Sequence, residues 1–203
     1  MSIKFIANSN ILVIGASGSG KTTAVLRIIQ EKLIDPMPTK IFYLYGAYQP
    51  EFDAWQKDET NAKITFIEGL DLSVVDRYKE PKLLICDDLI LELNRTLAQH
   101  FIAGSSHKNA TTIFISHSLF LNNELYRLIS NNSQYLLLFK NKRNFSQVAT
   151  LARQILGTRH ELLLSAYKYV KPYDFVLLSF HPLVPEELLV TTDYFEKCPS
   201  VFT

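Results

Sequence analysis

The sequence has 203 residues and a formal net charge of +1, with 47% hydrophobic and 20% charged residues. This composition excludes a disordered chain, and the length is that of one large domain or two small ones. The near-neutral charge excludes a strong overall attraction to nucleic acid or anionic membranes, so any polyanion contact must come from local patches. We expect one domain over residues 1–203, with an irregular, proline-containing tail from about residue 182.

Cys86 and Cys198 are the two cysteines, and Cys86 lies within an apolar run, which is typical of a buried thiol in a reducing compartment. We therefore expect neither a disulfide nor a metal site from them. The N-terminal residues lack the apolar core of a signal peptide, and no uncharged apolar run approaches the ~20 residues of a membrane span. These features predict a soluble, intracellular protein that is not secreted and has no membrane partner.

A glycine-rich segment, Gly15-Ala16-Ser17-Gly18-Ser19-Gly20-Lys21-Thr22, follows the apolar run at residues 11–14 and precedes a stretch with helical spacing. Strand, glycine-rich loop and helix in this order are the context of a P-loop. Its glycines let successive N–H groups turn inward around phosphates, and the helix adds the positive end of its dipole. Lys21 is placed to reach the β and γ phosphates, and the Thr22 hydroxyl to bind Mg²⁺. The expected ATP-binding residues are Gly15, Ala16, Ser17, Gly18, Ser19, Gly20, Lys21, Thr22 and Thr23.

After this loop the sequence alternates between helical and strand-like patterns. Helical spacing follows the loop until residues 35–38. Strands are expected at residues 41–45, 64–67, 83–86, 111–115, 135–139 and 175–178, and helices at 50–57, 91–103, 146–156 and 161–169, with a polar loop at 104–109. Such alternation predicts an α/β fold with a mostly parallel central sheet flanked by helices.

An acidic pair, Asp87-Asp88, ends the apolar run at residues 83–86. P-loop enzymes that hydrolyse nucleotides need an aspartate at a strand end for the Mg²⁺ shell and a group that activates water. We assign Asp87 to Mg²⁺ and Asp88 to the general base, the alternative being a solvated acidic turn. The next strand ends in Ser116-His117, which suits the additional-strand (ASCE) class of P-loop ATPases. In that class an extra strand, with a polar sensor at its end, lies between the P-loop strand and the acidic strand. A simple helix N-cap is the alternative for this pair.

Several further segments make a family resemblance specific. In this order along residues 10–154, they resemble the viral genome-packaging ATPases of the FtsK–HerA superfamily, most closely the poxvirus-type and Polinton/Maverick-like branch. The segments are Tyr45-Gly46-Ala47-Tyr48-Gln49-Pro50, Asp87-Asp88-Leu89, Gly104-Ser105-Ser106-His107, Ser116-His117-Ser118-Leu119-Phe120, Arg127-Leu128-Ile129-Ser130-Asn131-Asn132, Phe139-Lys140-Asn141-Lys142-Arg143, Gln147 and Leu151-Ala152-Arg153-Gln154.

The resemblance implies a homo-oligomeric ring, a pentamer or hexamer, that threads double-stranded DNA into a preformed viral capsid at the expense of ATP. It implies a sheet with strand order 5-1-4-3-2 and added strands, among them C-terminal ones. It also implies a location in the host cytoplasm or nucleus, or in association with the virion. His117 stands where the family usually has a glutamine sensor, and Asn144 replaces the acid that ends the family's Asn-Pro-Arg-Asp segment.

Arginines in these motifs are candidates for the finger that a neighbouring subunit supplies to the transition state. Arg143 and Arg127 rank first and Arg153 third, and a structural salt bridge or surface role remains the alternative for each. Lys140, Lys142 and Arg143 also form a basic cluster. Such a cluster is either a solvated turn or, repeated around a ring, part of a positive DNA channel.

Two other functions remain open from the sequence. A nucleoside or nucleotide kinase shares this length, and Asp76-Arg77-Tyr78 is similar to a short kinase motif. Phosphorylation of a nucleoside or a nucleoside monophosphate would favour that function. The second is a nucleotide-gated DNA-binding switch or a helicase-like motor unrelated to packaging. DNA-stimulated ATPase activity would separate a motor from a switch.

Overall fold

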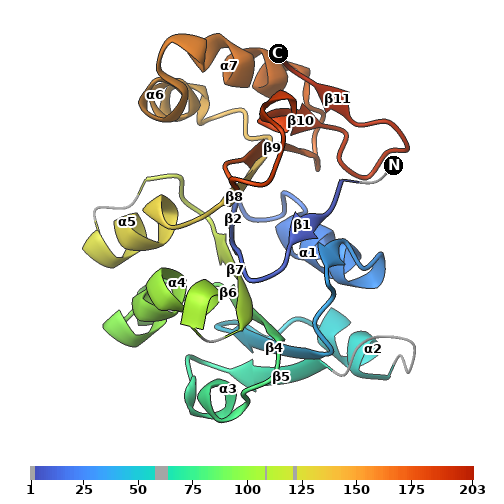
Figure 1. The fold of residues 1–203 in the computed structure, drawn as a ribbon, viewed down its shortest axis with the longest axis vertical. Coiled ribbons are helices and arrows are strands. Elements are labelled where there is room, and N and C mark those ends of the chain that lie inside the picture. The colour runs from blue at the N-terminus through green and yellow to red at the C-terminus, as the bar shows by residue number, and fades with distance from the viewer. Residues whose placement is uncertain (1–2, 58–63, 108, 121–122) are drawn as a thin grey trace.

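The computed structural model describes residues 3–57, 64–107, 109–120 and 123–203, and its centre is a large β-sheet (Figure 1). The strands of this sheet are β2 (Asn10–Ile14), β4 (Lys40–Tyr45), β5 (Ile64–Glu68), β6 (Lys82–Asp87), β7 (Ala110–Ser116), β8 (Tyr135–Phe139), β9 (Phe175–Ser179), β10 (Val190–Thr192) and β11 (Ser200–Val201). Their order is β11-β10-β9-β8-β2-β7-β6-β4-β5. Two short strands, β1 (Phe5–Ile6) and β3 (Ile34–Asp35), pair separately.

Helices cover both faces of the sheet (Figure 1). One face carries α1 (Lys21–Gln30) and α2 (Glu51–Lys57), and the other carries α3 (Ser73–Arg77), α4 (Arg95–His107), α5 (Glu124–Asn131), α6 (Phe145–Leu156) and α7 (His160–Tyr169). Short 3₁₀ turns lie at Ile90–Glu92, Gly157–Arg159 and Glu186–Leu188. No helix in the described ranges is long and apolar enough to cross a membrane.

The sheet is parallel from β8 through β2, β7, β6 and β4 to β5. Beyond β8, each strand pairs antiparallel with its neighbour: β9 with β8, β10 with β9 and β11 with β10. The predicted α/β class with added C-terminal strands is therefore confirmed. The predicted order 5-1-4-3-2 corresponds to β8-β2-β7-β6-β4, and β7 is the additional strand between the P-loop strand and the acidic strand.

Alternate residues of the central strands supply two hydrophobic cores. In β2, Leu12 and Ile14 pack with the core on the α4–α7 face, while Ile11 and Val13 pack with the core on the α1 face. This alternation follows from the two-residue period of a strand, and a sheet covered on both faces needs apolar residues at every position. The sheet therefore gives a rigid base to the loops at its edges.

Two stretches differ from the sequence predictions. The helix expected at residues 91–103 is divided into the 3₁₀ turn at Ile90–Glu92 and α4, and α4 continues through the glycine and serines expected in a polar loop. Each poor helix former costs only about 1 kcal/mol or less, which the buried residues Leu97 and Phe101 offset. The tail expected to be irregular from residue 182 contains β10 and β11, because Val190 and its neighbours are buried against β9.

Candidate functional site

The carboxyl ends of β2, β7 and β6 meet at one edge of the sheet, and the loops that follow them enclose a cavity of about 490 Å³. This size lies within the range of small-ligand pockets. The lining residues are Ser17, Gly18, Ser19, Gly20, Lys21, Thr22, Thr23, Ala47, Gln49, Asp87, Asp88, His117 and Tyr173. Loops that are far apart in the sequence thus contribute to one pocket, because the strands bring their ends together.

The glycine-rich loop has the geometry that its residue types allow. Gly18 and Gly20 have φ values of 70° and 96°, in the left-handed region that favours glycine. A Cβ at Gly15 would lie 2.5 Å from Ser19 Oγ and 2.6 Å from Phe139 Cβ, so no larger residue fits. Ser19 Oγ is buried and has no hydrogen-bond partner among the described residues. Together with the backbone N–H groups of such a loop, this hydroxyl is suited to a phosphate oxygen.

Lys21, the first residue of α1, places its ammonium group inside the cavity. Its Nζ donates to the carbonyl of Ala16 at 2.9 Å and to Nδ1 of His117 at 3.1 Å. Burial lowers the pKa of Lys21, and the negative charges of Asp87 and Asp88 oppose that decrease. A buried ammonium group among hydrogen-bond acceptors is prepared to bind an anion that replaces them.

His117 connects Lys21 to the second carboxylate of the acidic pair. Its Nε2 lies 3.2 Å from Oδ1 of Asp88. Since the Lys21 ammonium can only donate, Nδ1 must accept, and a neutral imidazole then carries its proton on Nε2 and donates it to Asp88. One ring thereby presents an acceptor to Lys21 and a donor to Asp88.

Asp87, the last residue of β6, is buried and receives several hydrogen bonds. Tyr43 Oη donates to its Oδ2 at 2.7 Å, Thr22 Oγ1 at 3.1 Å and Gln49 Nε2 at 3.5 Å. Burial raises the pKa of Asp87, while the bonds from Tyr43 and Thr22 and the charge of Lys21 oppose that increase. Carboxylate and hydroxyl oxygens side by side fit Mg²⁺, which binds oxygen ligands next to nucleotide phosphates.

Asp88 adopts a backbone conformation that few residues tolerate. Its φ is 56°, in the left-handed region where aspartate and asparagine are enriched. Gly46 packs directly against this turn, since a Cβ at Gly46 would lie 2.4 Å from the Asp88 carbonyl oxygen. The Gly46 N–H also donates to the Asp87 carbonyl at 2.9 Å. The loop after β4 therefore fixes the backbone of both acids.

No protein-family model matches the sequence, and no curated protein sequence matches it. The fold, in contrast, matches solved structures over almost the whole chain. The genome packaging NTPase B204 of Sulfolobus turreted icosahedral virus 2, in complex with ATPγS, matches with a TM-score of 0.62 at 10% identity, over 97% of each chain. The crystal structure of B204, the DNA-packaging ATPase from Sulfolobus turreted icosahedral virus, gives 0.60 at 10% identity, over 97% of this chain and 98% of that one.

The fold is that of a P-loop NTPase. A third match, B204 in complex with AMPPCP, has a TM-score of 0.57 at 10% identity, over 97% of each chain. Two of these matching structures thus contain ATP analogues. At such low identity the likeness establishes the fold alone, so the roles of individual residues must be argued from the geometry of this chain.

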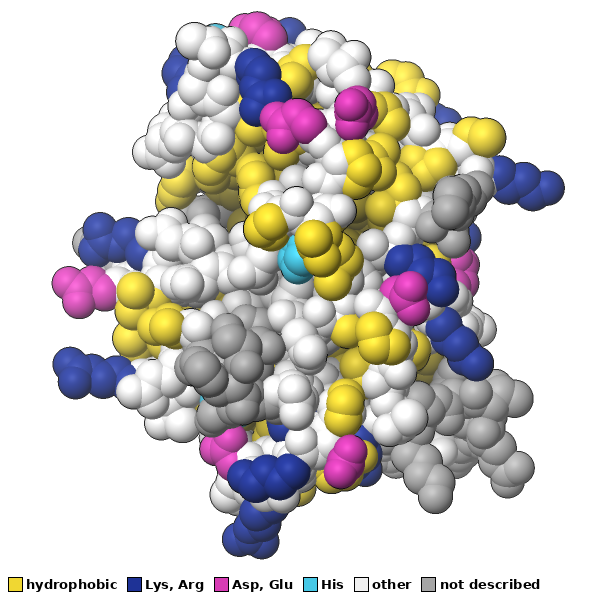
Figure 2. Space-filling view, in the orientation of Figure 1, with side chains coloured by type: hydrophobic (Ala, Val, Ile, Leu, Met, Phe, Trp, Pro, Cys, Tyr) yellow, Lys and Arg dark blue, Asp and Glu magenta, His cyan; other side chains and the backbone are white. Residues whose placement is uncertain are grey.

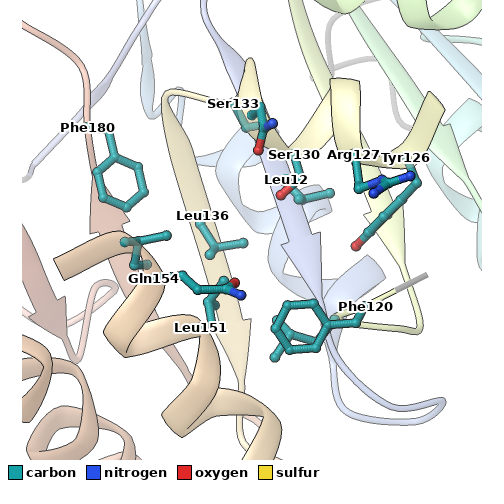
Figure 3. A pocket seen from close by; sticks show the side chains of 13 residues that line it. Leu12, Phe120, Tyr126, Arg127, Ser130, Ser133, Leu136, Leu151, Gln154 and Phe180 are labelled. Carbon is teal, nitrogen blue, oxygen red and sulfur yellow. The ribbon is translucent and has the colours of Figure 1, made fainter. Parts of the chain in front are cut away.

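None of the three candidate arginines lines the nucleotide cavity of the chain that carries it. Arg143 is exposed in the turn between β8 and α6, where its N–H donates to Oδ1 of Asn141 at 3.0 Å. Arg127 lies on α5 and lines a separate cavity of about 620 Å³ between α5 and α6, into which Gln154 also projects (Figure 3). Arg153 is exposed on α6.

The second cavity is the larger of the two and lies away from the phosphate loop. Its wall is mostly apolar, with the large rings of Phe120 and Phe180 at its margin (Figure 3). Figure 2 shows a recess with hydrophobic side chains on this side of the molecule, between the regions of α6 and α5. The chemistry expected of a P-loop enzyme lies in the smaller cavity, because only that one contains the acids and Lys21.

The basic cluster is divided by the structure. Lys140 Nζ donates to the carbonyl oxygens of Tyr167 and Lys168 at the end of α7. A cation in this position satisfies otherwise unpaired carbonyls and complements the helix dipole. Burial lowers the pKa of Lys140. Lys142 and Arg143 are exposed, so these two residues are the part of the cluster that is available to a partner.

The sequence assigned no role in the site to Tyr43, Gln49 or Tyr173, which line or support the nucleotide cavity. Tyr43 comes from the middle of β4 and Gln49 from the loop after it, while Tyr173 precedes β9. Tyr45-Gly46-Ala47-Tyr48-Gln49-Pro50 was among the family-like segments, which was a usable signal for Gln49. No local motif marks Tyr43 or Tyr173, and only the order and direction of the strands bring them to the cavity.

Proposed function

We propose that this chain is an ATPase that moves double-stranded DNA into a viral capsid, working as a homo-oligomeric ring of the FtsK–HerA type. The observation that carries the proposal is the cavity in which the P-loop, Lys21, the acidic pair and His117 converge. The fold likeness to genome-packaging NTPases over almost the whole chain supports the packaging role. The order of family-like motifs along the sequence supports it independently.

The side chains of the site have distinct roles in this proposal. The P-loop amides and the Ser19 hydroxyl bind phosphate oxygens, and Lys21 exchanges its bonds to Ala16 and His117 for the β and γ phosphates. Thr22 and Asp87 would hold Mg²⁺, which would supply positive charge next to the phosphates.

Asp88 accepts the proton of the water that attacks the γ phosphorus, and the bond to the β–γ bridging oxygen breaks. His117, which donates to Asp88, orients the carboxylate for this step. When Lys21 moves to the phosphates, Nδ1 of His117 loses its donor, so nucleotide binding is transmitted to the residue that holds the general base. Binding of a nucleotide to the P-loop is thereby coupled to the hydrolytic step.

In the proposed ring, a neighbouring subunit supplies a catalytic arginine to the site. An arginine from the adjacent subunit stabilises the transition state, and Arg143 is our first choice because it is exposed in the turn after β8, at the same sheet edge as the P-loop. Lys142 beside it contributes positive charge for the DNA backbone. A finger of this kind is worth about 10³–10⁵ in rate.

The kinase alternative loses its specific support. Asp76-Arg77-Tyr78 lies at the end of α3 and does not line the nucleotide cavity. Asp76 Oδ1 instead lies 3.1 Å from Nε2 of the buried His100. This contact ties α3 to α4, which explains an aspartate at this position without any role in phosphate transfer.

The test is to measure ATP hydrolysis with and without duplex DNA, together with the mass of the particle. We expect a pentamer or hexamer whose turnover rises with duplex DNA, and an Asp88→Asn protein that lacks the rise. A monomer that transfers phosphate to a nucleoside and ignores DNA would show a kinase. Binding of DNA that depends on ATP without DNA-stimulated turnover would show a switch.

A further inference from the structure

The direction of the nucleotide in its cavity follows from the order of strands at the carboxyl edge of the sheet. Asp87 ends β6 and Asp88 follows it, His117 follows β7, the P-loop follows β2, and Phe139 ends β8. Lys21, His117 and Asp88 mark the γ-phosphate end, on the β6 side of the P-loop. A bound nucleotide must therefore extend its nucleoside away from these residues, toward β8 and β9.

Tyr173 stands on that opposite side. Because β9 is antiparallel to β8, its first residue, Phe175, pairs with Phe139, and the residues just before it reach the same edge as the P-loop. Strands lie about 4.8 Å apart, so β9 is about 10 Å from β2 and about 19 Å from β6. Tyr173 and the acidic pair therefore lie on opposite sides of the P-loop strand.

The contacts of Tyr173 place it directly beside the phosphate loop. A Cβ built on Gly20 would lie 3.4 Å from the Tyr173 carbonyl oxygen and 3.7 Å from its Cβ. The residue is 77% exposed, and it is the only Phe, Tyr or Trp among the described residues that line the cavity. A large ring that lies beside the P-loop and is not packed into the core has a free face for a ligand.

The backbone of Tyr173 is held in an unfavourable conformation. Its φ is 66°, in the left-handed region that a bulky residue rarely adopts. The following residue fixes it, since the Asp174 carbonyl accepts from Lys140 N–H at 3.1 Å and the Asp174 N–H donates to the Lys171 carbonyl at 3.2 Å. Such strain is found where the surrounding structure positions a functional side chain.

We infer that Tyr173 is the base-stacking residue of the site: its ring forms a platform for the base of the nucleoside triphosphate. The inference rests on the proposed function, because it requires a nucleotide in the P-loop cavity. Base–aromatic stacking contributes binding energy without reading the hydrogen-bonding edge of the base. Tyr173 thereby distinguishes a nucleoside triphosphate from a bare triphosphate.

The experiment compares binding of ATPγS and of inorganic tripolyphosphate, both with Mg²⁺, by calorimetry. Tyr173→Gly removes the ring and suits the positive φ, and Tyr173→Phe keeps the ring without the hydroxyl. Tyr169→Ala is the matched control, since Tyr169 is 55% exposed at the end of α7 and does not line the cavity. We expect Tyr173→Gly to bind ATPγS about tenfold more weakly and tripolyphosphate as wild type does. Tyr173→Phe and Tyr169→Ala should bind both as wild type.

Two results would overturn the inference alone. They are an unchanged ATPγS affinity in Tyr173→Gly, and an equal loss of affinity for both ligands, which would show that the ring only supports the P-loop. A wild-type protein that binds neither ligand would instead overturn the proposed function together with this inference. The tripolyphosphate measurement therefore separates a failure of the stacking residue from a failure of the phosphate site.

Discussion

The hydroxyl of Tyr43 donates a hydrogen bond to Asp87, the proposed metal ligand, so Tyr43→Phe tests that assignment. The change removes one oxygen atom and leaves the ring packed against Phe52 and Phe66, whose centroids lie 5.1 and 5.2 Å away. Asp87 then loses its shortest hydrogen bond, the 2.7 Å contact, and keeps those from Thr22 and Gln49. A hydrogen bond to a charged group contributes about 1.5–3 kcal/mol, so the free energy of unfolding should fall by about this amount.

The effect on the site follows from the pKa of Asp87. Burial already raises that pKa, and the Tyr43 bond opposes the increase, so Tyr43→Phe raises it further. A carboxylate must be ionised to bind Mg²⁺, and removal of such a supporting partner typically weakens metal binding by about 10–100-fold. We expect the Mg²⁺ concentration that half-saturates ATPγS binding to rise by that factor, with ATPγS binding in EDTA unchanged.

Tyr194→Phe is the control for this experiment. Tyr194 is also buried, and its hydroxyl donates to the neutral carbonyl of Ile3 at 2.8 Å, away from the cavity. Its loss should cost about 1 kcal/mol of stability and leave the Mg²⁺ dependence as in wild type. An unaltered Mg²⁺ half-saturation in Tyr43→Phe, or an equal weakening in EDTA, would refute the assignment of Asp87 as a metal ligand that Tyr43 positions.

Three further substitutions test the acidic turn and the subunit interface. Asp88→Asn keeps a residue that tolerates the left-handed backbone, so it should bind Mg·ATP normally and hydrolyse it at least ~100-fold more slowly; near-normal turnover would require another base. Gly46→Ala places a Cβ 2.4 Å from the Asp88 carbonyl oxygen and should lower turnover by about 10²-fold. Gly157→Ala strains a backbone with φ 55° outside the cavity, so it should lower stability but retain turnover; equal rates in the two variants would mean that Gly46 does not hold the turn. Arg143→Ala should lose turnover and regain part of it when it is mixed with Asp88→Asn subunits. Native mass spectrometry shows whether mixed rings form, and ATPase assays measure their turnover. Absence of rescue in mixed rings would contradict a finger supplied in trans.

The parts of the site that a single local segment encodes could be predicted from the sequence. The P-loop and the Asp87-Asp88 pair are of this kind, because the strand that precedes each motif aims it at the edge of the sheet. The meeting of these two motifs with His117 also followed from the predicted parallel strands. Local pattern and strand direction were sufficient for these residues.

Contacts that depend on strand neighbours could not be predicted in this way. Tyr43 is an ordinary apolar-run residue in the sequence, and it reaches Asp87 only because β4 pairs beside β6, with Tyr43 opposite Ile85. Tyr173 would lie at the far end of the sheet if β9 were parallel, so its place near the P-loop depends on an antiparallel strand that no periodicity reveals. Lys140 was interpreted as part of a basic surface, but its Nζ donates to the Lys168 carbonyl at the end of α7. Nothing in the sequence predicts this contact.

The central claim is that hydrolysis of ATP by this chain moves it along duplex DNA. The most direct measurement is displacement of a fluorescent third strand from a DNA triplex, since a protein that moves along the duplex must push that strand off. We predict displacement that requires Mg·ATP and that neither ATPγS nor the Asp88→Asn protein supports. Vigorous ATP hydrolysis on the same DNA with the third strand left in place would contradict the account.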